Sequence, residues 1–151
     1  MELARPATDA DRAPCLQLLG AALAHAKSMR GGPALVGTAT PEDLLGRWAD
    51  ADVPAALFVG EYEGAVVGVL AVAAHDSGDQ RRGRIECCYV DEDARGVGVG
   101  TALMDAAVAW CEASACVEVD ALALPGDRST KQRLEAAGFT ARLLTLSRRL
   151  D

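Results

Sequence analysis

A glycine-rich segment in the middle of the chain constrains the fold more than any other part of the sequence. Residues 89–101 read YVDEDARGVGVGT, and apolar residues then recur at helical spacing as far as Trp110. The pattern predicts the end of a strand, an acidic turn, a glycine loop and the start of a helix. The three alternate glycines leave backbone N–H groups bare at the positive end of the helix dipole, and Arg95 adds a cation. The segment therefore predicts an anion site suited to phosphate.

Three kinds of phosphate loop agree with this segment at least in part. A Walker loop needs a Lys before the Ser or Thr at the helix start, and here Gly100 precedes Thr101. A dinucleotide-binding loop turns tightly after its strand, whereas four residues separate Val90 from Arg95, and the third glycine is missing. The pattern Arg-x-x-Gly-x-Gly, which includes Gly98, fits best. A glycine-rich turn without a ligand is the alternative, although alternate glycines weaken a helix start.

The third pattern resembles the acyl-CoA loop of the GNAT superfamily of N-acetyltransferases. The resemblance implies that the loop amides hold the CoA pyrophosphate and that the preceding strand pairs with the pantetheine arm. It also implies that a backbone N–H near residues 88–90 polarises the acetyl carbonyl, and that the turn after residue 125 lies beside the cofactor cleft. The cofactor-binding residues expected on this basis are Cys88, Tyr89, Val90, Arg95, Gly96, Val97, Gly98, Val99, Gly100, Thr101, Asp127 and Lys131.

The order of predicted elements is also that of the GNAT fold, so the resemblance extends over essentially the whole chain. We expect an α/β domain, residues 1–151, with a mixed sheet and helices on both faces. The strand before the glycine loop, the helix and the next strand form a parallel crossover unit, and the earlier hairpins are antiparallel. Predicted strands span residues 2–7, 55–62, 65–74, 84–90, 117–124 and 140–150; predicted helices span about 9–27, 41–50, 98–113 and 129–137, and a mobile loop spans 28–39.

Composition excludes several other classes of protein. The chain of 151 residues has a net charge of −7 and a pI of about 4.8, which argues against non-specific nucleic-acid binding. The five cysteines are odd in number, and the adjacent Cys87 and Cys88 point to opposite faces of a strand, so a reduced, cytoplasmic chain is expected. The longest apolar stretch, residues 65–74, is too short to span a membrane, and residues 1–6 contain no signal core. We expect no bound metal.

Glu86 is the preferred candidate for the catalytic base. A carboxylate is unusual in the middle of a strand, and many GNAT members place a Glu on this strand to accept the amine proton. The alternative is an ion pair with an arginine such as Arg82, or a position on a solvated face. His75 is a weaker candidate. A thiol nucleophile at Cys87 or Cys88 is disfavoured because no histidine is nearby in sequence.

The sequence departs from the family where the acid for the leaving thiolate is usually found. The Tyr expected four residues before Gly138-Phe139 is Leu134, and the Asn-x-x-Ala positions hold Asp127 and Thr130. Water can still protonate a CoA thiolate near neutral pH. The resemblance therefore implies transfer of acetyl from acetyl-CoA to a primary amine of a small molecule, peptide or protein, and the net negative charge mildly favours a cationic acceptor. An acyl-CoA sensor with little turnover is the alternative, and a homodimer is expected through the exposed last strand.

Overall fold

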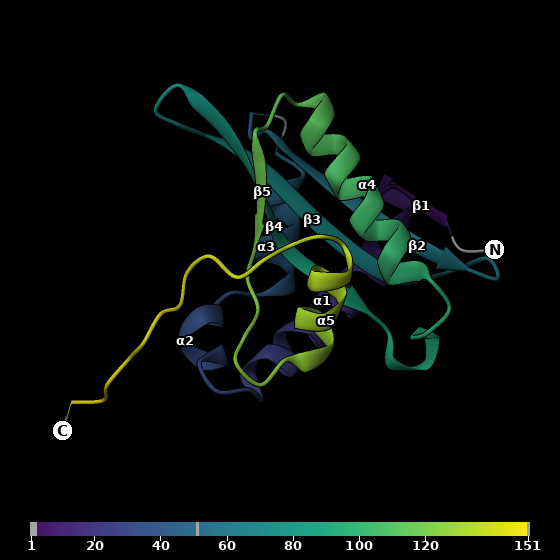
Figure 1. The fold of residues 1–151 in the computed structure, drawn as a ribbon. Coiled ribbons are helices and arrows are strands. Elements are labelled where there is room, and N and C mark those ends of the chain that lie inside the picture. The colour runs from purple at the N-terminus through teal and green to yellow at the C-terminus, as the bar shows by residue number, and fades with distance from the viewer. Residues whose placement is uncertain (1–2, 51, 151) are drawn as a thin grey trace.

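The computed structural model describes residues 3–50 and 52–150. These residues form one five-stranded sheet with the strand order β1-β2-β3-β4-β5 (Figure 1). The strands are β1 (Leu3–Pro6), β2 (Ala55–Tyr62), β3 (Ala65–Ser77), β4 (Gln80–Val90) and β5 (Glu118–Ala121). The helices are α1 (Arg12–Lys27), α2 (Gly32–Val36), α3 (Pro41–Trp48), α4 (Val99–Ala113) and α5 (Arg128–Ala136), with 3-10 turns η1 (Asp9–Asp11) and η2 (Glu92–Ala94).

Helices cover both faces of the sheet, as the sequence predicts. Helix α4 crosses strands β1 to β4 on one face, and α1 and α3 pack on the other (Figure 1). Leu103 and Met104 of α4 are buried in the first core, and Leu19 and Trp48 in the second. Strands β1 to β4 are antiparallel, and β5 is parallel to β4. The mixed sheet and the crossover through α4 are therefore confirmed.

Two local sequence signals define the start of α3 and the turn between β2 and β3. Thr40 Oγ1 accepts a hydrogen bond from the N–H of Asp43, and the Asp43 carboxylate accepts one from the N–H of Thr40. This capping box starts α3 at Pro41, where a missing N–H costs nothing. Glu63 and Gly64 both have positive φ, which is the geometry of a two-residue hairpin turn between β2 and β3.

Strand β4 contains an irregularity at Glu86. Val72 of β3 lies opposite Ile85, and the next pair joins Ala71 to Cys87, so Glu86 is an extra residue. Such a β-bulge bends the strand and redirects a side chain. Strand β5 pairs with β4 only as far as Ile85. Beyond that residue, the end of β4 has no strand beside it on the β5 side within the described part of the chain.

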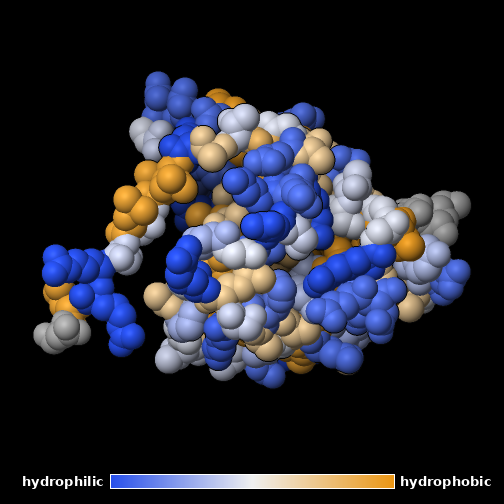
Figure 2. Space-filling view, turned by 60° about the horizontal axis from the view of Figure 1, so that its bottom comes forward, coloured by the Kyte–Doolittle hydropathy of each residue, from blue (hydrophilic) through white to orange (hydrophobic). Residues whose placement is uncertain are grey.

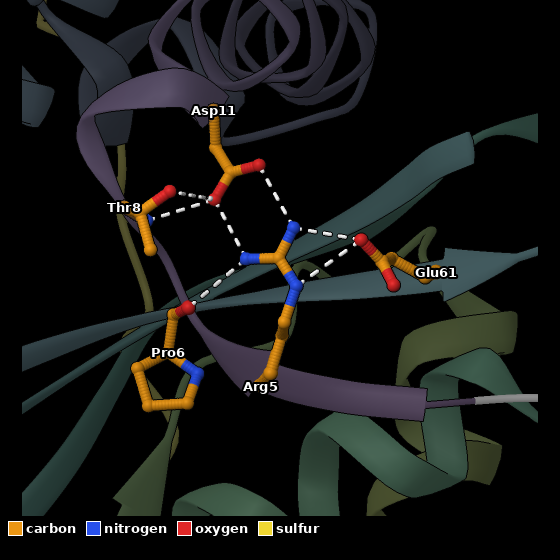
Figure 3. A network of polar contacts seen from close by, with 5 residues as sticks. All are labelled: Arg5, Pro6, Thr8, Asp11 and Glu61. Atoms are coloured by element: carbon orange, nitrogen blue, oxygen red, sulfur yellow. Dashed lines mark hydrogen bonds and ion pairs between the residues drawn. The ribbon is translucent and has the colours of Figure 1, made fainter. Parts of the chain in front are cut away.

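A network of hydrogen bonds and ion pairs links β1 to β2 and to the turn before α1 (Figure 3). The guanidinium of Arg5 on β1 donates to both carboxylate oxygens of Asp11, at 2.7 and 2.9 Å, and to Glu61 of β2 at 2.7 Å. The Asp11 side chain also accepts from the N–H of Thr8 at 2.8 Å. Arg5 holds the pKa of the buried Asp11 carboxyl well below its usual range, through these charged hydrogen bonds. The network joins β1, β2 and the start of α1.

The predicted strand at residues 140–150 is wrong: this segment contains no helix or strand. It leaves the body of the molecule after α5 and runs outward (Figures 1 and 2). A strand forms only where another strand's edge pairs with it, and this segment contacts β5 through an ion pair from Arg142 to Asp120 at 2.9 Å, without ladder hydrogen bonds. The expected dimer through a last strand therefore loses its basis. The tail exposes Leu143, Leu144, Leu146 and Leu150.

Other boundaries differ less. The predicted loop at 28–39 contains the short helix α2, and the hairpin of β3 and β4 extends outward to Ser77 and Gln80, beyond the predicted strand ends at residues 74 and 84. Cross-strand pairing continues there although the residues are polar, because the ladder bonds do not depend on the side chains. Strand β5 is shorter than predicted and ends at Ala121, because it pairs with β4 only to that point.

Candidate active site

The glycine loop lines a small cavity at the start of α4. The cavity has a volume of about 270 Å³, and we call it the loop cavity. Most of the residues that the sequence predicts for the phosphate site meet here. Its lining consists of Val90, Ala94, Arg95, Gly96, Gly98, Val99, Gly100, Thr101 and Arg133.

The backbone of the loop requires glycine at the start of α4. Gly98 is the residue before the first turn, with φ of 94°, a left-handed conformation that other residues adopt at a cost. The first N–H groups of α4 have no partner within the helix and lie at its positive end. An anion in the loop cavity would satisfy them.

Arg95 is fastened to the end of β4. Its Nε donates to the carbonyl oxygen of Val90 at 3.1 Å, and its guanidinium carbon lies 5.6 Å from the centre of the Tyr89 ring. The side chain lines the loop cavity and also a larger neighbouring cavity, described below. These contacts set the charge of Arg95 beside the helix start with little freedom.

Arg133 of α5 is a second cation at the loop cavity, and the sequence analysis did not identify it. Its Nη1 donates to Cys88 Sγ at 3.7 Å. A Cβ atom at Gly100 would lie 2.9 Å from Arg133 Nε, so the glycine provides the space that this guanidinium occupies. Thr130 also faces this part of the molecule, and residues three apart on a helix lie on the same face. This spacing would have indicated Arg133 from the sequence.

A larger cavity of about 450 Å³, which we call the main cavity, lies along the free end of β4. Parts of α1, α2, α3, β4, the segment after β5 and α5 line it. Val90, Arg95 and Arg133 line both cavities, so the two adjoin each other. Its lining includes Leu19, Leu23, His25, Leu35, Leu44, Arg47, Trp48, Arg84, Glu86, Cys87, Cys88, Tyr89, Leu122, Leu124, Asp127, Thr130 and Leu134.

Glu86 lies in the main cavity, at the bulge of β4. Its carboxylate accepts hydrogen bonds from Trp48 Nε1 at 2.8 Å and from Arg47 of α3. The predicted base therefore has an arginine partner, but a different one from the suggested Arg82, which pairs with Glu118. The Glu86 side chain is 20% exposed, so its carboxylate remains accessible from the main cavity.

The cysteines of β4 are poor nucleophiles. Burial raises the pKa of the Cys87 thiol to about 12. Burial also raises the pKa of Cys88, and the nearby charge of Arg133 offsets this in part. Since the thiolate is the reactive form, both groups stay protonated near neutral pH.

The two histidines have opposite positions. His75 is exposed and lies outside both cavities, so it has no contact with the cleft. His25 of α1 lines the main cavity, with its ring centre 6.3 Å from that of Tyr89. The sequence analysis did not single out His25.

Three of the predicted cofactor residues have positions or contacts that do not point to cofactor binding. Val97 lines neither cavity and packs against the core under α4. Lys131 also lines neither cavity, and it forms a surface pair with Glu135 at 4.0 Å. Asp127 lines the main cavity, but its carboxylate caps α5 by accepting from the N–H of Thr130 at 3.2 Å.

Residues 3–50 and 52–150 contain neither a membrane-spanning helix nor a metal-binding cluster. No helix in these ranges combines the length and apolarity that a membrane crossing needs. The same ranges hold no group of three or more His, Cys, Asp or Glu residues arranged to bind a metal ion.

Comparisons with known proteins agree with this geometry. Residues 27–139 match the family model described as Acetyltransferase (GNAT) family. A comparison with curated protein sequences gave no match.

Similar solved structures include three proteins, each under 25% identical, so they support the fold alone. A ribosomal-protein-alanine N-acetyltransferase from Brucella melitensis biovar Abortus 2308 is 17% identical, with a TM-score of 0.73 and 100% of both chains covered. A glucosamine-6-phosphate N-acetyltransferase from Arabidopsis thaliana is 18% identical, with a TM-score of 0.68, over 100% of this chain and 99% of that one. A transcriptional regulator from Bacillus halodurans C-125 is 19% identical, with a TM-score of 0.77, over 99% and 100%.

Proposed function

Because the chain belongs to the GNAT family of acetyltransferases, we propose that it transfers an acetyl group from acetyl-CoA to a primary amine. The observation that carries the proposal is the position of the loop cavity beside the unpaired end of β4. The cavity offers helix N–H groups and two arginines to phosphates, and the strand offers free backbone groups to an extended pantetheine arm. The main cavity continues from there to Glu86.

Each step of acyl transfer has a group in one of the two cavities. Arg133 and the loop of residues 95–101 hold the pyrophosphate. A backbone N–H at the end of β4 polarises the acetyl carbonyl. Glu86 accepts a proton from the amine, directly or through water. The thioester supplies the acetyl group: a carbon–nitrogen bond forms as the carbon–sulfur bond breaks. Water protonates the departing thiolate, because Leu134 is buried where an acid would stand.

The first experiment is a calorimetric titration of the purified chain with acetyl-CoA, with NAD and ATP as controls. We expect acetyl-CoA alone to bind, with a dissociation constant on the order of micromolar. Release of free CoA in the presence of amines then measures transfer. The absence of acetyl-CoA binding would contradict the assignment of the loop cavity.

An acyl-CoA sensor is the second candidate. Leu134 favours it, because this residue occupies the position where the family usually has the acid for the thiolate, and one structural neighbour is described as a transcriptional regulator. A sensor would bind acetyl-CoA without releasing CoA when amines are added. The carboxylate of Glu86 in the main cavity favours the enzyme, because it can accept the proton of an amine there.

We also propose that the chain acts as a single domain in the cytoplasm. All five cysteines are free, which agrees with a reducing compartment. A fraction of wild-type chain isolated under non-reducing conditions with a disulfide between these residues would argue against this location.

A further inference from the structure

Resting on the proposed function, we infer that the acceptor is a monoamine whose single amino group is attached to an apolar, uncharged body. The inference comes from the residues that surround Glu86 in the main cavity. It differs from the expectation that the overall negative charge of the chain favours a cationic acceptor.

The first observation is the chemistry of the wall opposite β4. Helices α1, α2 and α3 and the segment after β5 present mostly aliphatic and aromatic side chains to the cavity. A small molecule gains most from such a wall when its own surface is apolar. These residues include Leu19, Leu23, Leu35, Leu44, Leu122 and Leu124.

The second observation is the sign of the charge in the cavity. Four arginines and two carboxylates line it, although the whole chain has a net charge of −7. Arg95 and Arg133 adjoin the loop cavity and are available to phosphates, whereas Arg47 and Arg84 remain on the acceptor side. Arg47 is already paired with Glu86, so the additional ammonium groups of a polyamine would chiefly meet the charge of Arg84, which raises the energy of binding.

The third observation concerns the two carboxylates. Glu86 already accepts from Arg47 and Trp48, which leaves it able to receive one amine. Asp127 uses its oxygens for the N–H and hydroxyl of Thr130. A second ammonium group on the acceptor would find only Asp127, whose two oxygens already accept from Thr130. The cavity therefore suits one amino group and no more.

The fourth observation is the exposure of two leucines in the lining. Leu35 of α2 is 53% exposed and Leu122 is 60% exposed, and both belong to the main cavity. An apolar body that covers them removes this surface from water. Burying the surface of an aromatic ring corresponds to a gain of about thirtyfold or more in affinity.

The test compares three amines as acceptors: 2-phenylethylamine, ethanolamine and spermidine. Free CoA is separated by chromatography, because the five free thiols of the chain would react with a thiol reagent. We expect kcat/KM for 2-phenylethylamine to exceed the value for either polar amine by about tenfold or more. Calorimetry without acetyl-CoA measures the binding of each amine directly, and the same order is expected.

A variant on α2 adds a matched control. Leu35→Glu places a carboxylate in the lining at an exposed position, where folding is little affected. It should lower kcat/KM for 2-phenylethylamine about tenfold and raise the value for spermidine, with acetyl-CoA binding unchanged. Leu143→Glu makes the same change on the exposed tail, outside both cavities, and should change neither value.

The outcomes separate this inference from the proposed function. If spermidine or ethanolamine is acetylated as well as 2-phenylethylamine, the acceptor class is wrong and the function stands. If acetyl-CoA binds but 2-phenylethylamine neither binds nor reacts, the acceptor class is again wrong. If acetyl-CoA itself does not bind, the proposed function fails.

Discussion

The two cavities that meet at the end of β4 are built from different kinds of sequence. The loop cavity comes almost entirely from one continuous segment, residues 90–101, with a single addition from α5. The main cavity takes its lining from α1, α2, α3, β4, the segment after β5 and α5. A ligand group common to a whole family can be held by backbone in one loop, whereas a specific acceptor needs side chains from many elements.

The difference predicts two kinds of sensitivity to substitution. Changes in the loop cavity should affect the binding of acetyl-CoA and leave the choice of acceptor alone. Changes in the main cavity around Glu86 should affect turnover and the choice of amine, with little effect on acetyl-CoA binding. The predictions below test this division, from the largest expected effect to the smallest.

Gly98→Asp should have the largest effect. The substitution places a carboxylate against the pyrophosphate and requires a left-handed backbone at φ of 94°. We expect acetyl-CoA affinity to fall by about a hundredfold or more, measured by calorimetry. Gly64→Asp is the control, because Gly64 has φ of 82° in the β2–β3 turn and lines neither cavity. Equal affinity in both variants would contradict the loop assignment.

Glu86→Gln should affect turnover and leave acetyl-CoA binding unchanged. The amide cannot accept the amine proton, so kcat should fall by about a hundredfold while acetyl-CoA binds as before. The pH of maximum turnover should rise, because the reaction then depends on amine that has already lost its proton in solution. A pH–rate profile gives the answer. An unchanged profile would remove Glu86 from the role of base.

Arg133→Gln should lower acetyl-CoA affinity by about tenfold, because one partly buried cation is lost beside the phosphates. Titration with S-acetylpantetheine, which lacks the pyrophosphate, should give the same affinity for the variant and the wild type. Lys131→Gln removes a charge from the same helix outside both cavities and should change nothing. A loss of affinity for Lys131→Gln equal to that for Arg133→Gln would mean that only the general charge of α5 matters.

Asp11→Asn should leave both cavities unaffected and change stability alone. Breaking the network with Arg5 should lower the free energy of unfolding by about 2 kcal/mol at pH 7, measured with urea. Arg5 lowers the pKa of Asp11 in the folded state, so this stabilisation is present above a pH of about 4 and is lost as the pH falls further. The difference between wild type and variant should therefore shrink in acid. A variant with altered acetyl-CoA affinity at pH 7 would contradict the independence of the network from the cleft.

Much of the fold could be predicted because its signals are local. The capping box at Thr40, the turn at Glu63-Gly64 and the glycine loop each depend on a few neighbouring residues. The predicted strand at residues 140–150 failed for the opposite reason. An apolar, β-branched-poor pattern there is compatible with a strand, but pairing depends on an edge that the segment itself does not contain.

The order of strands β1 to β5, the helix that starts at the glycine loop and the resemblance of the loop to the GNAT family could be read from the sequence alone. Tertiary structure decided what surrounds the reactive positions. The partner of Glu86 is Arg47, 39 residues earlier, and the cation beside Cys88 is Arg133, 45 residues later. Helix caps and turns follow from backbone conformations of adjacent residues. The charge and apolarity of the cleft arise only when the sheet, its bulge at Glu86 and the covering helices bring distant side chains together.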